Sequence, residues 1–274
     1  MSPQLRPRAF AARIKLIDAT PIGINVRSTV ATYCGALDDV RRAYARTDSA
    51  KAAGLKMGDF SYNTGSLRCA TCDGTGQISL DVQFLPDVDI ACPDCRGSRY
   101  DTAAEKIRRP EKGAPDDQAL SLPHLLALSV DEALPHVADV KKAHEKLQTL
   151  HDLGLGYLTL GEATPALSGG EAQRLKLASE MGRGQADAVF VFDEPTIGLH
   201  PRDVETLLGV FQRLVEQGAT VVVVEHDLDF IANADYVIDM GPQGGKAGGR
   251  IVACGTPEEI AANRESITGG YLEN

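Results

Sequence analysis

The chain has 274 residues, 43% hydrophobic and 24% charged, a balance typical of a globular protein and unlike that of a disordered one. The formal net charge of −10 does not favour a protein that coats nucleic acid, and no apolar run reaches the ~18 residues of a membrane span. The N-terminus carries no apolar secretory signal, so we expect a cytoplasmic protein without a membrane partner.

The charge is unevenly distributed along the chain. Residues 1–70 hold 11 lysines and arginines against 5 acidic residues, whereas residues 71–274 hold 17 against 33. A basic first quarter is compatible with a local anion-binding face and equally with an ordinary solvated surface. Charge alone therefore leaves the partner open.

In chain order, the first expected element is a strand over residues 13–18, where apolar and polar side chains alternate, ending near Pro21. Strands over 78–85 and 88–91, with a turn at Pro86 and Asp87, follow in a mixed region. The helices expected next, beyond a stretch rich in proline and charge at 108–115, cover residues 130–135 and 137–153.

From residue 161 onward the pattern alternates regularly between helix and strand. Two apolar strands joined by an amphipathic helix form a βαβ unit, which implies a parallel sheet covered on both faces. A glycine-rich stretch, residues 241–249, precedes the last strand. The expected elements are a helix over 168–181, a strand over 188–192, a helix over 202–217, a fully buried strand over 221–224, a short helix over 228–232, and strands over 236–240 and 250–253.

Four of the six cysteines form two Cys-x-x-Cys pairs, Cys69 with Cys72 and Cys92 with Cys95, separated by 19 residues. Each pair can present two thiolates to one ion, and this spacing lies within the range of tetrahedral zinc sites. Four protein ligands close such a site, so the zinc would be structural. The alternatives are a redox dithiol and four ordinary cysteines.

The remaining two cysteines, Cys34 and Cys254, are isolated in the sequence. Most isolated cysteines in proteins are small core residues, and we interpret both as structural.

Residues 167–174 read Leu-Ser-Gly-Gly-Glu-Ala-Gln-Arg. Ser168 and Glu171 have the spacing of a capping box, which places free amides and the positive end of the helix dipole at this point. Gly169 and Gly170 let a phosphate approach the backbone. Plain helix capping is the alternative interpretation.

Residues 189–195 read Val-Phe-Val-Phe-Asp-Glu-Pro, a buried strand that delivers Asp193 and Glu194 to the carboxyl edge of a parallel sheet. One carboxylate can hold Mg²⁺, and the other can orient or deprotonate a water for phosphoryl transfer. His226 comes 33 residues after Asp193, just past the next strand. Alone, each of these could be a turn residue or a satisfied histidine.

Taken in order, these segments resemble the signature loop, Walker B strand, D-loop and switch histidine of ABC-type ATPases. The D-loop reads Thr-Ile-Gly-Leu-His, and Glu225, His226 and Asp227 form the switch. The cysteine module, with the segments 61–63, 84–87, 239–242 and 255–257, narrows the resemblance to the C-terminal portion of the UvrA family, the damage-recognition ATPases of bacterial nucleotide excision repair. It covers residues 13–257.

The resemblance implies an α/β fold. It would be a partial ABC-type P-loop ATPase domain, with a parallel sheet core and no Walker A segment, and a mostly helical signature insertion carrying a zinc-binding β-hairpin module. The implied parts are 1–23 (a core strand and an altered Q-loop), 24–165 (the insertion, with the zinc module at 65–101), 166–262 (signature helix, Walker B, D-loop and switch histidine) and 263–274 (a C-terminal tail).

The resemblance also implies roles for single residues. Asp193 would coordinate Mg²⁺, Glu194 would polarise water, and His226 would contact the γ-phosphate. The nucleotide and its metal would be bound by Ser168, Gly169, Gly170, Gln173 and Asp193. Contacts to DNA phosphates around the zinc module would come from Arg68, Arg96, Arg99, Arg108 and Arg109. A second copy of the protein and a UvrB-like repair subunit are the implied protein partners.

Two features depart from the family pattern. No Gly-x-x-x-x-Gly-Lys-Ser/Thr loop occurs, the nearest lookalike being residues 244–247, and in the family that loop lies upstream of where this chain begins. Ala19 stands where the family has the glutamine that senses the nucleotide phosphate and the metal. We therefore expect a partial ATPase that is inactive by itself and needs ATP and Mg²⁺ only in the complete protein.

Two other functions remain open at this stage. A UvrA-like paralogue acting in drug resistance or export is slightly favoured by Ala19. A zinc-dependent binding module without hydrolysis is the other, because the pattern from Cys69 to Gly76 also resembles the zinc modules of DnaJ-type chaperones.

Overall fold

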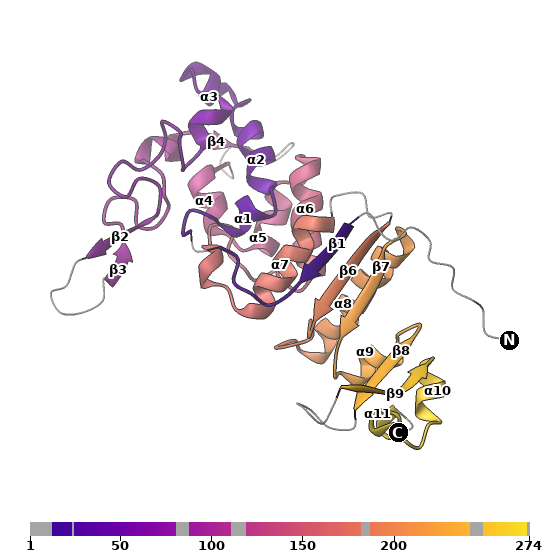
Figure 1. The fold of residues 1–274 in the computed structure, drawn as a ribbon. Helices are drawn as coiled ribbons and strands as arrows, with labels where there is room; N and C mark the ends of the chain where they lie inside the picture. Colours follow the sequence, from indigo (N-terminus) through magenta and orange to yellow (C-terminus); the bar gives the residue numbers. More distant parts are fainter. Residues whose placement is uncertain are drawn as a thin grey trace. The chain divides into compact units, whose positions relative to one another are not determined.

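The protein is represented by a computed structural model that describes residues 13–23, 25–80, 88–110, 119–181, 187–241 and 249–272 (Figure 1). It divides into a sheet unit, Met1–Asp18 with Gln185–Asn274, and a helical unit, Ala19–Gly184. The turn expected at residues 86–87, the end of the strand expected over 78–85, and most of the glycine-rich stretch at 241–249 lie outside the described residues.

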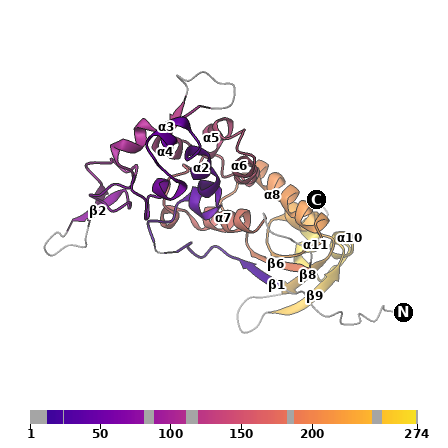
Figure 2. The ribbon, with the colours of Figure 1, turned by 90° about the horizontal axis from the view of Figure 1, so that it is seen from above.

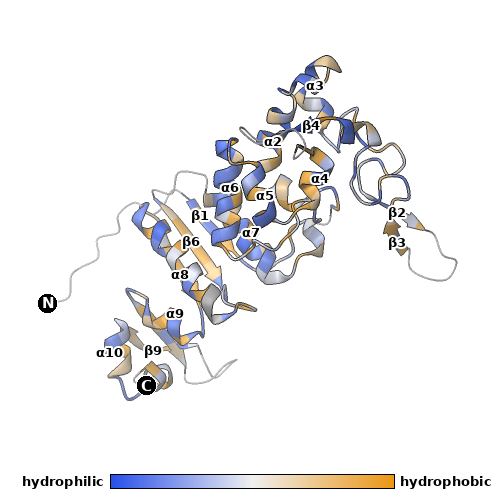
Figure 3. Ribbon diagram, turned by 180° about the vertical axis from the view of Figure 1, so that it is seen from behind, coloured by the Kyte–Doolittle hydropathy of each residue, from blue (hydrophilic) through white to orange (hydrophobic). Residues whose placement is uncertain are grey.

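Three parallel strands in the order β1 (Arg13–Ile17), β6 (Ala188–Asp193) and β7 (Thr220–Val224) form the core of the sheet unit. Helix α8 (Pro201–Glu216) connects β6 to β7, so the expected βαβ unit is confirmed. The Phe211 ring of α8 lies 4.3 Å from the Phe192 ring of β6. Strand β6 is among the most hydrophobic parts of the ribbon in Figure 3. This packing buries one face of the sheet.

The opposite face of the sheet is exposed in the described part of the chain, and the expectation of cover on both faces was wrong. Ile14 and Leu16 of β1 are 75% and 61% exposed, and Val222 and Val224 of β7 are 46% and 50% exposed. The strand expected to be fully buried, β7, is therefore partly buried on one face and exposed on the other. Apolar side chains on both faces predict that a strand is buried on both faces, but they do not identify the segment that packs against each face.

The remaining two strands of the sheet unit form a separate antiparallel ribbon, β8 (Val237–Gly241) with β9 (Arg250–Gly255), visible in Figure 2. The segment expected to be a tail includes a packed helix, because Gly269 is buried and the Ser266 hydroxyl donates to Asp239 at 2.6 Å. The helices that accompany this ribbon are α9 (Leu228–Ala232), α10 (Pro257–Ala261) and α11 (Ile267–Leu272).

The helical unit is built from short helices around aromatic side chains. Tyr44 packs against Phe60 with ring centroids 6.1 Å apart, and Tyr62 meets Tyr100 edge to face at 5.9 Å. Its elements are α1 (Val30–Tyr33), α2 (Ala36–Tyr44), α3 (Asp48–Ala52), η1 (Met57–Phe60), β2 (Gln77–Leu80), β3 (Val88–Ala91), η2 (Thr102–Lys106), β4 (Arg108–Arg109), β5 (Leu120–Ser121), α4 (Leu122–Ala127), α5 (Val130–His136), α6 (Lys141–Asp152), η4 (Thr164–Ala166) and α7 (Gly169–Met181).

The start of one helix and the two divisions between the units differ from those expected. Helix α6 begins at Lys141 rather than at residue 137, because the Val140 amide donates to the Val137 carbonyl and closes a turn ahead of the helix. The units divide at 18/19 and 184/185, whereas the expected divisions were 23/24 and 165/166, so α7 belongs to the helical unit. The α/β class with a parallel sheet is confirmed.

Candidate functional site

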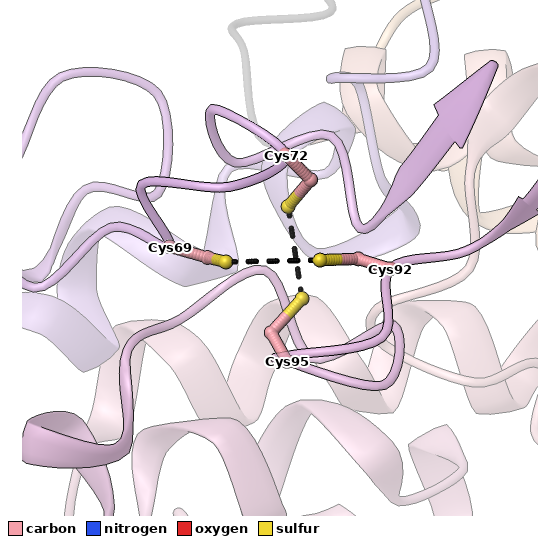
Figure 4. A group of neighbouring side chains, drawn as sticks. All are labelled: Cys69, Cys72, Cys92 and Cys95. Carbon is pink, nitrogen blue, oxygen red and sulfur yellow. Dashed lines mark hydrogen bonds between the residues drawn. The ribbon is translucent and has the colours of Figure 1, made fainter.

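The four paired cysteines converge on one point (Figure 4). Their sulfur atoms all lie within 4.8 Å of one another, with Cys69 Sγ 3.9 Å from Cys92 Sγ and Cys72 Sγ 3.6 Å from Cys95 Sγ. A zinc ion bound by four thiolates at ~2.3 Å separates the sulfurs by about 3.8 Å. The residues therefore fit a tetrahedral metal centre, and no disulfide joins them.

The backbone around the cluster is shaped for this arrangement. Strands β2 and β3 pair antiparallel and bring the two cysteine pairs together, as the sequence predicted. The Gly76 amide donates to Cys72 Sγ at 3.3 Å. Gly74 has a φ of +77°, and a Cβ there would lie 1.7 Å from the Tyr62 carbonyl oxygen, so only glycine fits this turn.

The thiols differ in acidity because their surroundings differ. Burial raises the pKa of Cys95 to about 12 and also raises that of Cys69. Burial acts in the same direction on Cys72, but hydrogen bonds from the Gly76 amide and the neighbouring thiols lower its pKa to about 7. A metal must displace protons from the thiols of Cys69 and Cys95, so the affinity of the site for metal falls as the pH falls.

The two isolated cysteines have different environments. Cys34 is buried in the helical unit, as expected, and burial raises its pKa to about 11. Cys254 is exposed on β9, so its interpretation as a core residue was wrong.

In the sheet unit, the acidic residues after β6 meet the loop after β7. Asp193 ends β6 opposite Val224, and the Glu194 amide donates to the Val224 carbonyl at 2.9 Å. Glu194 Oε1 lies 3.6 Å from His226 Nε2, with both side chains open to solvent. The backbone of Glu194 adopts a φ of 46°, the left-handed region that residues with a Cβ rarely use. The two predicted catalytic side chains are thus neighbours at the carboxyl edge of the sheet.

Glu225 organises both loops, a role that could not be predicted from its place beside His226. One carboxylate oxygen accepts from the Thr196 amide at 2.8 Å. The other accepts from the amides of His226 at 2.8 Å and Asp227 at 3.2 Å. A single carboxylate therefore ties the loop that carries Glu194 to the loop that carries His226.

Glu225→Gln should separate these loops. The substitution keeps the length of the side chain but replaces one acceptor oxygen with an amide NH₂ group that faces backbone donors, and hydrogen bonds to a charged acceptor are the stronger ones. We expect amide exchange of residues 194–198 and 225–228 to accelerate about tenfold or more. Hydrogen–deuterium exchange followed by mass spectrometry measures this.

The matched control is Asp229→Asn, which removes the same charge from an exposed position in α9. It should leave the exchange of both loops unchanged. Equal acceleration in the two variants would show that charge, rather than the bridging geometry, governs these loops.

The signature segment forms the predicted capping box at the start of α7. The Ser168 amide donates to Glu171 at 2.6 Å, and the Glu171 amide donates to the Ser168 hydroxyl at 3.4 Å. A Cβ at Gly169 would lie 3.2 Å from the Ala19 Cβ, so the first residue of the helix packs on the altered Q-loop position. Gln173, predicted to contact nucleotide, is only 2% exposed.

The five arginines expected to meet DNA fall into two groups. Around the cysteines, Arg96 is exposed, Arg68 is paired with Asp73 at 2.9 Å, and Arg99 is only 6% exposed. The burial of Arg99 keeps it from a DNA phosphate. Arg108 and Arg109 lie on β4 and belong to a different surface.

That second surface is a groove of about 770 Å³ between α2, α3, β4 and the start of α6. Its carboxylates are already partnered in the described chain: Asp39 binds Arg42 and Lys146, Asp48 binds Lys51, and Asp139 binds Arg109. The groove therefore has an excess of positive charge. Its cationic side chains are Arg42, Arg46, Arg108, Arg109, Lys141 and Lys142.

None of the helices in the described ranges is both long enough and apolar enough to cross a bilayer.

Comparison with known proteins gives a consistent result. No family model matches the chain. It is 47% identical to UvrABC system protein A of Streptococcus pyogenes serotype M6 and 48% identical to that of Bacillus subtilis, in each case over 258 residues that are 94% of this chain and 26% of the relative. The crystal structure of UvrA2 from Deinococcus radiodurans superimposes with a TM-score of 0.85 at 44% identity, over 96% of this chain and 31% of that one. The chain spans about a quarter of the length of the curated relatives.

Proposed function

Because this chain is a segment of a UvrA-family protein, we propose that it works within an ABC-type ATPase that recognises damaged DNA in nucleotide excision repair. The observation that carries the proposal is the presence, in one chain, of a complete four-cysteine centre and of Glu194 facing His226 at 3.6 Å. A binding module without hydrolysis would have no use for the second feature.

On the ATPase side, the carboxylate loops supply the groups that phosphoryl transfer requires. Asp193, at the end of β6, would coordinate Mg²⁺, which neutralises charge developing on the phosphates. Glu194 would accept a proton from, or orient, the attacking water, and His226 would donate a hydrogen bond to the γ-phosphate. Ser168, Gly169 and Gly170, at the start of α7, would bind a nucleotide phosphate, whereas Gln173 is too deeply buried to reach one.

On the DNA side, the cysteine centre would bind one zinc ion, which supplies a structural cross-link between the two cysteine pairs. Phosphate contacts would come from Arg96 beside that centre and from the basic groove. We propose a second copy of the protein and a UvrB-like subunit as further partners. Because the proposed ligand is DNA, we also propose that the protein works in the cytoplasm.

The phosphate contacts can be tested in the groove. Arg46 and Lys142 line it, and neither has an ionic partner among the described residues. Replacing both with alanine should weaken duplex binding by a similar factor for every sequence. The slope of log K against log salt should fall in magnitude by about 0.9 per lost phosphate contact. Fluorescence anisotropy over a salt series measures both quantities.

Lys56→Ala is the matched control for Lys142→Ala, because Lys56 is an exposed lysine of the same unit that does not line the groove. It should leave the salt slope unchanged. A strong base-sequence preference would contradict phosphate contact. The repair role itself fails if the complete protein, with ATP, binds a duplex carrying one bulky lesion no better than the intact duplex.

A further inference from the structure

We infer that Arg99 is a positioning residue that fastens the cysteine module to a backbone strap, residues 19–23 and 25–31, whose other end holds the start of α7. Through this strap, the state of the four-cysteine centre determines how firmly the signature segment is held. The inference does not depend on the proposed reaction, since every contact that carries it lies within the helical unit.

Arg99 contacts both the module and the strap. Its Nη1 donates to the Val26 carbonyl of the strap at 2.9 Å and to the Gly74 carbonyl of the first cysteine turn at 3.4 Å. Its own carbonyl accepts from the Cys69 amide at 3.0 Å, and its guanidinium lies 5.3 Å from the centre of the Tyr62 ring. A buried guanidinium requires such partners, so its position is closely defined.

A second clasp lies beside the first. The Tyr62 hydroxyl donates to the Arg27 carbonyl of the strap at 2.9 Å. The Arg27 side chain binds Asp73 Oδ2 at 2.7 Å, and Asp73 directly follows the metal-ligating position Cys72. The strap is therefore tied to the module at two successive residues, 26 and 27.

At its other end the same strap contacts α7, whose start carries the signature segment (residues 167–174), and Thr164 just ahead of it. The hydroxyl of Thr164, a residue 1% exposed, donates to the Ile22 carbonyl at 3.1 Å. Lys176 of α7 donates to the Thr20 hydroxyl at 2.7 Å. Ala19 packs against Gly169, the first residue of α7. A few residues of backbone thus join the cysteine centre to the helix that carries the signature.

These contacts couple the four-cysteine centre mechanically to the start of α7. With the four sulfurs held together, Asp73, Gly74 and Arg99 keep fixed positions, and the strap is pinned at residues 26 and 27. When the sulfurs are released, these anchors loosen together, and the strap restrains Gly169 and Thr164 less firmly. Its remaining ties are backbone hydrogen bonds, from the Thr164 amide to the Ser28 carbonyl at 2.9 Å and from the Val30 amide to the Glu162 carbonyl at 3.0 Å. The coupling runs in both directions by linkage, so a ligand that orders the start of α7 should also tighten the module.

The test compares Arg99→Ala with Arg96→Ala in the whole chain loaded with zinc. The pair is closely matched, because both arginines lie in the second cysteine turn with positive φ, 72° and 50°, while Arg96 is exposed. Neither is a ligand, so both variants should keep one zinc per chain. We expect exchange of residues 19–31 and 164–172 to accelerate about tenfold in Arg99→Ala and to stay unchanged in Arg96→Ala.

Removing zinc from the wild-type chain with a chelator supplies the second arm. The same two segments should exchange faster, while strands β6 and β7 should not change. In Arg99→Ala, chelation should add little at 164–172, because the connection is already cut. An unchanged 164–172 segment in zinc-loaded Arg99→Ala, or equal responses to chelation in wild type and Arg99→Ala, would overturn the inference.

If Arg99→Ala fails to retain zinc, Tyr62→Phe replaces it. This variant keeps the ring under Arg99 and removes only the hydroxyl, which donates to the Arg27 carbonyl and lies 3.1 Å from the Thr29 hydroxyl, both in the strap. Faster exchange of residues 25–31 and 164–172, with one zinc retained, supports the strap. Unchanged exchange in both segments rules it out.

Discussion

Replacing Cys92 with serine is expected to abolish tight zinc binding and to loosen residues 65–101 far more than the parallel sheet. Cys92 is fully buried at the centre of the cluster, 3.9 Å from Cys69. A serine hydroxyl is a poor zinc ligand, and the binding energy of a structural zinc is folding energy for the segment that surrounds it. The module is closed at its base by the bridge between Arg68 and Tyr100, so its loss should not reach the parallel sheet.

Metal content by mass spectrometry should fall from one zinc per chain to nearly none. Hydrogen exchange should accelerate most in peptides from 65–101, less at residues 19–31 and 164–172, and not in the parallel sheet. Cys34→Ser is the matched control: it makes the same change at a buried cysteine of the same unit that lies outside the cluster. It should keep the zinc. If Cys92→Ser retains stoichiometric zinc, or if the module and the sheet lose protection equally, the description of the module as a local metal-stapled element is wrong.

The second large effect concerns Glu194. In the complete parent protein, Glu194→Gln should lower ATP turnover by roughly 10²–10⁴-fold and spare ATP binding, because the amide cannot accept the proton of the attacking water. The chain of 274 residues by itself should neither bind ATP tightly nor hydrolyse it. Most triphosphate affinity in this fold comes from the amides and lysine of a phosphate loop, and the sequence contains no such motif.

Glu216→Gln, at the exposed end of α8, removes the same charge away from the loops and should leave turnover unchanged. Steady-state phosphate release and fluorescent-nucleotide binding measure the two properties separately. Hydrolysis by the 274-residue chain alone, lost on Glu194→Gln, would refute the proposal that the chain supplies only part of the ATPase.

Local patterns predicted most of the elements. Residues 188–192, 202–217 and 228–232 carry strong periodicity with clear ends, and the structure places β6, α8 and α9 within a residue or two of those bounds. The cysteine spacing predicted a convergence that the sulfur distances confirm. In both cases the information lies within the segment itself, because periodicity and ligand spacing are properties of neighbouring residues.

Features that depend on distant partners were not predictable in this way. Arg99 looked like a surface cation beside the cysteines, but its burial follows from Tyr62 and Val26, far away in the sequence. Glu225 looked like part of a motif, and only the folded loops show that it accepts from Thr196. The half-exposed β7 has the same origin, since cover is a property of the whole fold.

The left-handed residues noted above have a consequence for attempts to stabilise this chain. Arg96 and Glu194 adopt positive φ angles at which glycine would be free of strain, and both side chains are open to solvent. Keeping a side chain at such a position costs about 1 kcal/mol. A directed-evolution screen for heat resistance would therefore favour glycine at these two sites. At residue 194 it would enrich variants that melt later and have lost the carboxylate next to His226, so selection for stability and selection for turnover would favour different residues there.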